Sequence, residues 1–184
     1  MSIDRRSLIA GASAAAAALA AAPAARAEDK LLNLDTVYGR TVIKTRPDIA
    51  PKHVAQIETL VKRHFYDGVK FHRVIDGFMA QTGDPTGTGT GKSDLPNIPA
   101  EFSKEKFLRG TVGMARGQDN DSANCQFFIC FAPARYLEEQ YTVWGEVISG
   151  MEFIDKIKAG TQANNGQVDH PDKIISLRFA PDAE

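Results

Sequence analysis

Short runs of alternating apolar and polar residues dominate the chain from residue 31 onward, and this period predicts β-strands. Tyr38-Gly39-Arg40 separates the first two runs as a turn, which indicates an opening hairpin. Asp76-Gly77, a pair typical of tight hairpin turns, separates the next two. The expected strands cover 31–35, 41–44, 70–75, 78–82, 110–115, 126–131, 142–147 and 174–179.

Two stretches have helical spacing instead. Apolar residues recur every three or four positions from Val54 to Phe65, and Pro51 suits a first helical turn. We therefore expect a helix over 51–65 and a shorter one over 151–158. About eight strands, two helices and no internal repeat favour a mainly β barrel or sandwich in one domain over a βαβ design.

The segment 83–99 is rich in Gly, Thr and Pro and has no apolar period, so it predicts a long surface loop, a class that is often functional. Its sequence Gly87-Thr-Gly-Thr-Gly-Lys-Ser93 is close to a phosphate-binding loop. That motif requires glycine at the position of Thr86 and a helix directly after it, and neither is present. A surface loop is the favoured interpretation.

Adjacent large apolar residues occur twice within the expected strands, as Phe78-Met79 and as Phe127-Phe128. Neighbouring strand residues point to opposite faces, so each pair places one apolar side chain outside a single core. Two explanations stay open at this point. The two helices cover these residues, or the residues form a binding surface.

The N-terminus has the pattern of a secretory signal over residues 1–27. Arg5-Arg6 precedes an Ala-rich stretch, and Ala25-Arg26-Ala27 suits a cleavage site. The paired arginines resemble a twin-arginine signal, although Asp4 is unusual there and the general secretion route stays open. Export, in this reading to the periplasm, leaves residues 28–184 as the mature domain. A retained anchor is the alternative, but Ala and Pro23 disfavour stable membrane insertion.

Composition excludes some function classes. Residues 1–27 contain three Arg and one Asp, so the remaining chain has 19 basic and 22 acidic side chains, which does not favour nucleic acid. Export would allow a disulfide, but Cys125 and Cys130 are an odd number of positions apart in an expected strand and face opposite ways. We expect two buried free thiols. His53, His64 and His170 show no metal-ligand spacing.

Three segments resemble the cyclophilin family. The first is Phe71-His-Arg-Val-Ile-Asp-Gly-Phe-Met-Ala-Gln-Thr-Gly-Asp84, with Thr82 in place of a glycine. The others are the stretch from Gly113-Met-Ala-Arg116 through Ser122-Ala-Asn-Cys-Gln-Phe-Phe-Ile129, and Trp144-Gly-Glu-Val147. The resemblance covers nearly all of 31–179. It implies a closed eight-stranded antiparallel β-barrel, capped by two α-helices, with an active groove on its outer wall.

The resemblance also implies an activity, peptidyl-prolyl cis-trans isomerisation, and the residues that carry it. Arg73 is the implied principal catalytic residue, and Gln81 holds the neighbouring substrate backbone. An apolar pocket receives the proline, and the remaining residues line the groove or its rim. The implied catalytic set is Arg73, Phe78, Gln81 and Phe128, and the implied substrate-binding set is Met79, Ala115, Arg116, Tyr136, Leu137 and Tyr141.

This chemistry requires no cofactor or metal, because rotation about an amide breaks no covalent bond. Proline-containing flexible polypeptides are the expected partners. A proline-binding chaperone with incidental turnover is the alternative function. Tyr136 stands where the best-known eukaryotic members carry a Trp associated with cyclosporin, so we expect weak cyclosporin binding, and Tyr141 replaces a common His.

Several polar residues near these motifs favour plain interpretations. Strand alternation turns His72 away from Arg73, which favours a packed, hydrogen-bonded imidazole. The pairs Asp84/Asp94 and Glu138/Glu139 show no sign of paired-carboxylate catalysis, and we expect them to be solvated.

Overall fold

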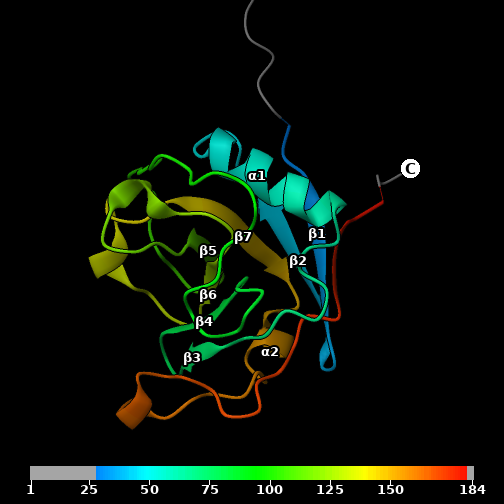
Figure 1. The fold of residues 1–184 in the computed structure, drawn as a ribbon. Helices are drawn as coiled ribbons and strands as arrows, with labels where there is room; N and C mark the ends of the chain where they lie inside the picture. Colours follow the sequence, from blue (N-terminus) through cyan, green and yellow to red (C-terminus); the bar gives the residue numbers. More distant parts are fainter. Residues whose placement is uncertain (1–27, 182–184) are drawn as a thin grey trace, which may run out of the picture.

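The computed structural model describes residues 28–181, and the expected signal peptide at 1–27 lies outside them. One antiparallel sheet of eight strands runs in the order β3-β4-β6-β5-β7-β2-β1-β8 and curls around a central core (Figure 1). Each strand overlaps a predicted one. The bounds are β1 Leu31–Thr36, β2 Gly39–Thr45, β3 Arg73–Ile75, β4 Met79–Thr82, β5 Thr111–Met114, β6 Phe127–Cys130, β7 Val143–Ser149 and β8 Ser176–Phe179.

The predicted closure of the barrel is an overstatement, because β3 and β8 end the strand order and do not pair with each other. Backbone hydrogen bonds between residues 68–71 and 172–174 bridge this gap. Gly68 N donates to Ile174 O at 2.8 Å, and Phe71 N donates to Asp172 O at 2.9 Å. The sheet is therefore a curled half-barrel whose last seam is made by extended segments outside the strands.

Thr82 lies near this seam, where the family's motif has a glycine. Its side chain is fully buried, and its hydroxyl donates to the Lys70 carbonyl at 2.9 Å. The hydroxyl therefore has a partner in the interior, which a buried polar group requires. The departure from the family's motif fits this position.

Two α-helices lie at opposite ends of the sheet, α1 Pro51–Lys62 and α2 Met151–Ile154 (Figure 1). Both are shorter than predicted. α1 ends because His64 adopts a left-handed conformation with φ of 58°, so Phe65 follows the helix rather than belonging to it. After α2 the chain forms a tight turn, in which Ile157 N donates to Ile154 O at 3.1 Å.

The core inside the sheet contains most of the fully buried side chains. Phe127 lies at its centre, with ring edges against Tyr66 at 5.5 Å and against Trp144 at 5.4 Å between centroids. α1 contributes a buried apolar face that includes Ile57 and Leu60. The predicted free, buried thiols are confirmed, and burial raises the pKa of Cys125 to about 11.

Segment 83–99 forms no helix or named strand, as predicted, apart from one β-bridge between Ile98 and Ala123. The expectation that Asp84 is solvated is wrong. Asp84 is 1% exposed and accepts hydrogen bonds from the backbone N–H groups of Thr86, Gly89 and Gly91. Its carboxylate therefore organises the first half of this loop from the inside.

Within residues 28–181, no helix is long and apolar enough to cross a membrane.

Candidate active site

Four residues, one on each of four neighbouring strands, form a row across the outer face of the sheet. Arg73 on β3 pairs with Gln81 on β4, Gln81 pairs with Phe128 on β6, and Phe128 pairs with Gly113 on β5. Residues in direct register on neighbouring strands project to the same face. This row places a guanidinium, an amide and an aromatic ring side by side.

An apolar pocket forms around the aromatic end of this row. Phe128 is 5% exposed and stacks on Phe107, with ring centroids 5.9 Å apart. Neither α1 nor α2 contributes a residue to this cluster, so the explanation that the helices cover these residues is wrong, and the binding surface stays a prediction. The buried members of the cluster are Met79, Phe107, Phe128, Cys130, Ala134, Leu137 and Val143.

Gly113 makes room for the two stacked rings. A Cβ atom built on Gly113 would lie 2.4 Å from Phe128 Cζ and 2.8 Å from Phe107 Cε1. Any other residue would therefore displace the floor of the pocket. The sequence predicts neither the packing of Phe107 under Phe128 nor the space that Gly113 provides. Phe107 lies in a segment without periodicity, and an isolated glycine in a strand has many explanations.

All ten site residues inferred from the resemblance line one hollow of about 400 Å³, together with Gln140, which the sequence did not indicate. Met79 and Leu137 form its buried floor with Phe128, while Phe78 is half-buried. The geometry brings the residues together, and their individual roles remain predictions. The complete lining is Arg73, Phe78, Met79, Gln81, Ala115, Arg116, Phe128, Tyr136, Leu137, Gln140 and Tyr141.

Arg73 is half-buried at the edge of this hollow and is held by neutral oxygen atoms. Its Nε donates to Asn165 O at 3.0 Å, its Nη2 to Asn165 Oδ1 at 3.1 Å, and its Nη1 to Gln81 Oε1 at 3.2 Å. Burial lowers the pKa of Arg73, and the phenol groups of Tyr141 and Tyr136 oppose that shift. None of the ion pairs among the described residues includes Arg73.

Gln81 connects Arg73 to the surface loop through a second glutamine. Gln81 Nε2 donates to Gln126 Oε1 at 3.0 Å, and Gln126 Nε2 donates to the carbonyl oxygens of Gly89 and Gly91 at 3.1 and 2.9 Å. Gln126 is not among the site residues predicted from the sequence. Its position two residues before Phe128, and so on the same face of the chain, was the available signal.

Two tyrosines and one arginine form the rim of the hollow. Tyr136 is 63% exposed and packs against Phe78, with centroids 5.6 Å apart, while Tyr141 meets Phe128 edge-on at 6.0 Å. The Arg116 guanidinium lies 4.6 Å from the Tyr141 ring centroid and donates to the Gln140 carbonyl. The Arg116 side chain therefore shapes the rim.

A second hollow, of about 260 Å³, adjoins the first and shares Gln81, Ala115 and Arg116 with it. Residues 89–92 form one of its walls. The wall continues into segment 93–97, which Asn124 holds. Its Oδ1 accepts from Ser93 N and Ser93 Oγ, and its Nδ2 donates to Leu95 O at 2.8 Å.

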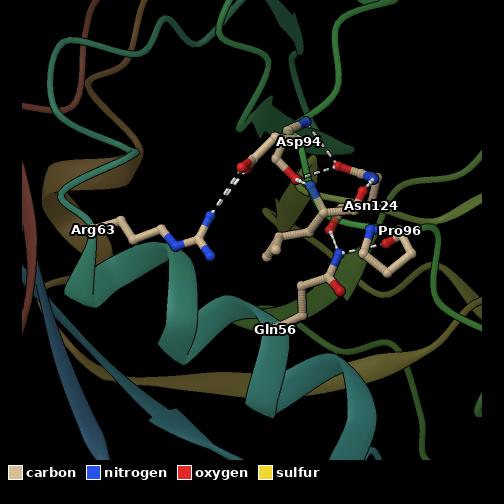
Figure 2. A network of polar contacts seen from close by, with 7 residues as sticks. Gln56, Arg63, Asp94, Pro96 and Asn124 are labelled. Carbon is tan, nitrogen blue, oxygen red and sulfur yellow. Dashed lines mark hydrogen bonds and ion pairs between the residues drawn. The ribbon is translucent and has the colours of Figure 1, made fainter.

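Helix α1 supports the same segment from the other side (Figure 2). Gln56 Nε2 donates to Pro96 O at 3.0 Å and to Asn124 O at 2.9 Å, and Arg63 forms an ion pair with the exposed Asp94. The loop is thus fixed at several points along its length. A fixed wall gives the groove a defined width before any ligand binds.

His72 is packed, as predicted, at 6% exposure, and burial lowers its pKa. The expected hydrogen bond is not found, because neither ring nitrogen has a partner with hydrogen-bond geometry in the described part of the chain. Within residues 28–181, no group of three or more His, Cys, Asp or Glu is arranged to hold a metal ion.

Comparisons with known proteins identify the family of the chain. Residues 31–179 match the family model described as cyclophilin type peptidyl-prolyl cis-trans isomerase/CLD. A "Probable peptidyl-prolyl cis-trans isomerase" from Brucella abortus (strain 2308) is 50% identical over 196 residues, which cover 100% of both chains.

Solved structures show the same fold. Cyclophilin AquaCyp293 from Hirschia baltica has a TM-score of 0.74 at 28% identity, covering 85% of this chain and 76% of that one. A cyclophilin-type isomerase from Cryptosporidium parvum, solved in the presence of the dipeptide Ala-Pro, has a TM-score of 0.76 at 24% identity, covering 83% and 100%.

The curled eight-stranded sheet and the matched sequence define an isomerase of X-Pro peptide bonds as the class of protein. The chain belongs to the cyclophilin-type peptidyl-prolyl cis-trans isomerase family, as its sequence motifs implied.

Proposed function

We propose that this protein accelerates rotation about X-Pro peptide bonds by placing the proline in the outer pocket and the Arg73 guanidinium beside the twisted amide. The observation that carries the proposal is the position of Arg73. It borders a hollow with an apolar floor, and only neutral oxygens bind it among the described residues. A positive charge at such a place is available to a ligand.

The energetic task is to lower a barrier of roughly 18–20 kcal/mol, most of which is lost amide resonance. In the twisted state the proline nitrogen becomes pyramidal and regains a lone pair. A guanidinium N–H donates to that lone pair, which the planar ground state does not offer, so the interaction favours the transition state selectively. No covalent bond forms or breaks, and no nucleophile takes part.

The pocket contributes through its shape and its low polarity. Met79, Phe128 and Leu137 are each at most 6% exposed, so a proline ring meets a rigid apolar floor. Excluding water around the amide strengthens the interaction with Arg73, because charge interactions grow as the local dielectric falls. Gln81 then holds the substrate backbone next to the pocket.

We propose proline-containing segments of unfolded or flexible polypeptides as the substrates. Both hollows are open to the surface, which suits a chain segment rather than a small molecule, and a protein of the same fold was solved in the presence of Ala-Pro. The pattern of residues 1–27 supports a site of action outside the cytoplasm. Tyr136 at the rim supports weak cyclosporin binding.

The test compares the full chain with its Arg73→Ala and Arg73→Lys variants in a cis-trans exchange assay on an Ala-Ala-Pro-Phe peptide, followed by NMR. Arg73→Ala should lower kcat/KM by roughly 10²- to 10³-fold, the usual effect of removing one transition-state donor. Arg73→Lys retains the charge but loses the planar fork, so it should recover only part of the rate. Equal rates for all three proteins would refute the mechanism.

The same variants separate an isomerase from a chaperone. A proline-binding chaperone requires the pocket but not the guanidinium, so Arg73→Ala would leave its suppression of aggregation nearly intact. Phe128→Ala removes the pocket floor and should impair both activities. If Arg73→Ala abolishes exchange and spares aggregation suppression, while Phe128→Ala impairs both, the two activities share one groove and only turnover uses Arg73.

A further inference from the structure

Arg73 is bound more extensively by one residue outside the sheet than by its neighbour within it. Asn165 supplies two acceptors, its backbone carbonyl to Nε and its side-chain oxygen to Nη2, whereas Gln81 supplies one. Nε and Nη2 form one planar edge of the guanidinium, so two acceptors on that edge fix both the position and the plane of the group.

We propose that Asn165 is a positioning residue that sets the plane of the Arg73 guanidinium while leaving its positive charge uncompensated. This inference rests on the proposed function. A guanidinium has five N–H groups, and three of them are used by Asn165 and Gln81. The remaining two are the donors available to a substrate, and their direction follows from the plane that Asn165 sets.

The neutrality of Asn165 is as important as its geometry. An aspartate could also accept from both nitrogens, and carboxylates are the usual partners of arginine in such a fork. A carboxylate would compensate the charge on which the proposed mechanism depends. An amide offers the same oxygen without a negative charge, which retains the electrostatic effect of Arg73.

The loop that carries Asn165 lies beside β3 (Figure 1), and backbone hydrogen bonds anchor it there in addition to the Asn165 side chain. Val74 N donates to Gly166 O at 2.8 Å, and Gly160 N donates to Val74 O at 3.0 Å. A Cβ on Gly166 would lie 2.4 Å from Ile75 Cγ1, so the loop is tightly seated against the strand. Removing the Asn165 side chain should therefore leave its backbone carbonyl in place.

Asn165 itself adopts a left-handed conformation with φ of 56°. Asparagine and glycine both tolerate this conformation, so Asn165→Gly removes the side-chain acceptor without straining the backbone. Asn165→Asp retains an acceptor and adds a charge. Asn164→Ala is a matched control, because the Asn164 amide accepts from Thr161 Oγ1 on the same loop and does not contact Arg73.

The experiment measures cis-trans exchange on the Ala-Ala-Pro-Phe peptide and the ¹⁵Nη–H signals of Arg73, which are assigned from their loss in Arg73→Lys. Asn165→Gly should lower kcat roughly tenfold, since a hydrogen bond to a charged group is lost, with KM within about twofold of native. Its Nη2 protons should exchange faster with water, because they lose the Asn165 side-chain oxygen, while the Nε proton keeps the Asn165 backbone carbonyl. Asn165→Asp should keep slow proton exchange yet also lower kcat, while Asn164→Ala should match native in both readouts.

A native kcat in either Asn165 variant would overturn the inference, as would a kcat loss fully explained by a lower melting temperature. Arg73→Ala, measured in parallel, distinguishes a failure of the role proposed for Asn165 from a failure of the proposed function. If Arg73→Ala is impaired and Asn165→Gly is native, only the role of Asn165 fails. If Arg73→Ala is itself native, the proposed function fails.

Discussion

Phe127 and Phe128 are neighbours on β6, and their surroundings differ sharply. Phe127 is fully buried inside the sheet, where Tyr66 and Trp144 pack against it edge-on. Phe128 lies outside the sheet on a smaller apolar cluster, and its pocket opens to the surface. Protein side chains surround the inner core on all sides. The outer cluster packs against the protein on one side only, and its other side is open to a ligand.

This difference separates stability from function within one strand. The inner residue contributes mainly to the free energy of folding, since all of its surface is buried by the protein itself. The outer residue contributes less to folding and more to the shape of the pocket. The same substitution at the two positions should therefore affect stability and activity differently.

Alanine at the two positions gives the largest expected contrast. Phe127→Ala should lower the free energy of unfolding by about 3–5 kcal/mol, because it leaves a cavity in a closed core. Phe128→Ala should cost about 1–3 kcal/mol, since the space opens into the existing hollow and water can enter it. Urea titration followed by fluorescence of Trp144, the single tryptophan, measures both.

Activity per folded molecule should show the reverse order. At a temperature where both variants are folded, Phe127→Ala should remain within a few-fold of native kcat/KM, while Phe128→Ala should lose at least about tenfold, in line with lost transition-state contacts. Equal stability losses together with equal activity losses would show that the two faces are not separable.

Much of the fold that separates the two faces of the sheet is predicted from the sequence. Alternation correctly separates Phe128 from the inner core that holds Phe127, and the strand positions follow the predicted ones closely. The same prediction is wrong for Phe78-Met79, because β4 begins at Met79 and both side chains join the outer cluster. The seam between 68–71 and 172–174 was not predictable, because it consists of backbone hydrogen bonds, such as those from Gly68 N to Ile174 O and from Phe71 N to Asp172 O. Such pairing leaves no pattern in the side chains.

The supporting residues of the site were missed for similar reasons. Phe107 comes from a segment with no period, yet tertiary packing places its ring under Phe128. Asn165, followed by Gly166, has only the signature of a turn. Asp84 was wrongly expected to be solvated, because its partners are backbone N–H groups, which no side-chain pattern reveals. Local sequence specifies strands well and specifies contacts between distant loops poorly.

Gly113→Ala tests the outer face with a smaller change, the addition of one methyl group. Its added methyl group collides with Phe128 and Phe107, so we expect a cost of about 1–3 kcal/mol and a displaced pocket floor. Activity should fall with stability. Gly145→Ala is the matched control, because its Cβ would lie 3.1 Å from Ile43 Cγ2 on the inner face. It should lower stability without lowering kcat/KM per folded molecule.

Low pH should destabilise the loop that forms one wall of the outer groove, because it protonates Asp84. The expected loss of stability is smaller than for the substitutions above. Burial acts to raise the pKa of Asp84, but hydrogen bonds from Thr86, Gly91 and Gly89 outweigh it and lower the pKa to about 2. Because the folded-state pKa lies below the unfolded value, the stabilisation is complete at neutral pH and is lost as pH falls toward 2. The total is about 2 kcal/mol, of which roughly half should be lost by pH 3.

Asp84→Asn isolates this contribution from all the other carboxylates. Asparagine retains one acceptor oxygen and cannot become negatively charged, so the stability gap between native and variant should be widest near pH 6 and narrow as pH falls to 3. Urea titrations at both pH values measure the gap. His72, whose pKa the Asp84 charge acts to raise, is present in both proteins, so most of its own titration cancels. A gap that stays constant would mean that the loop derives its stability from Gln126 and Asn124 rather than from the buried charge, because those amides do not titrate.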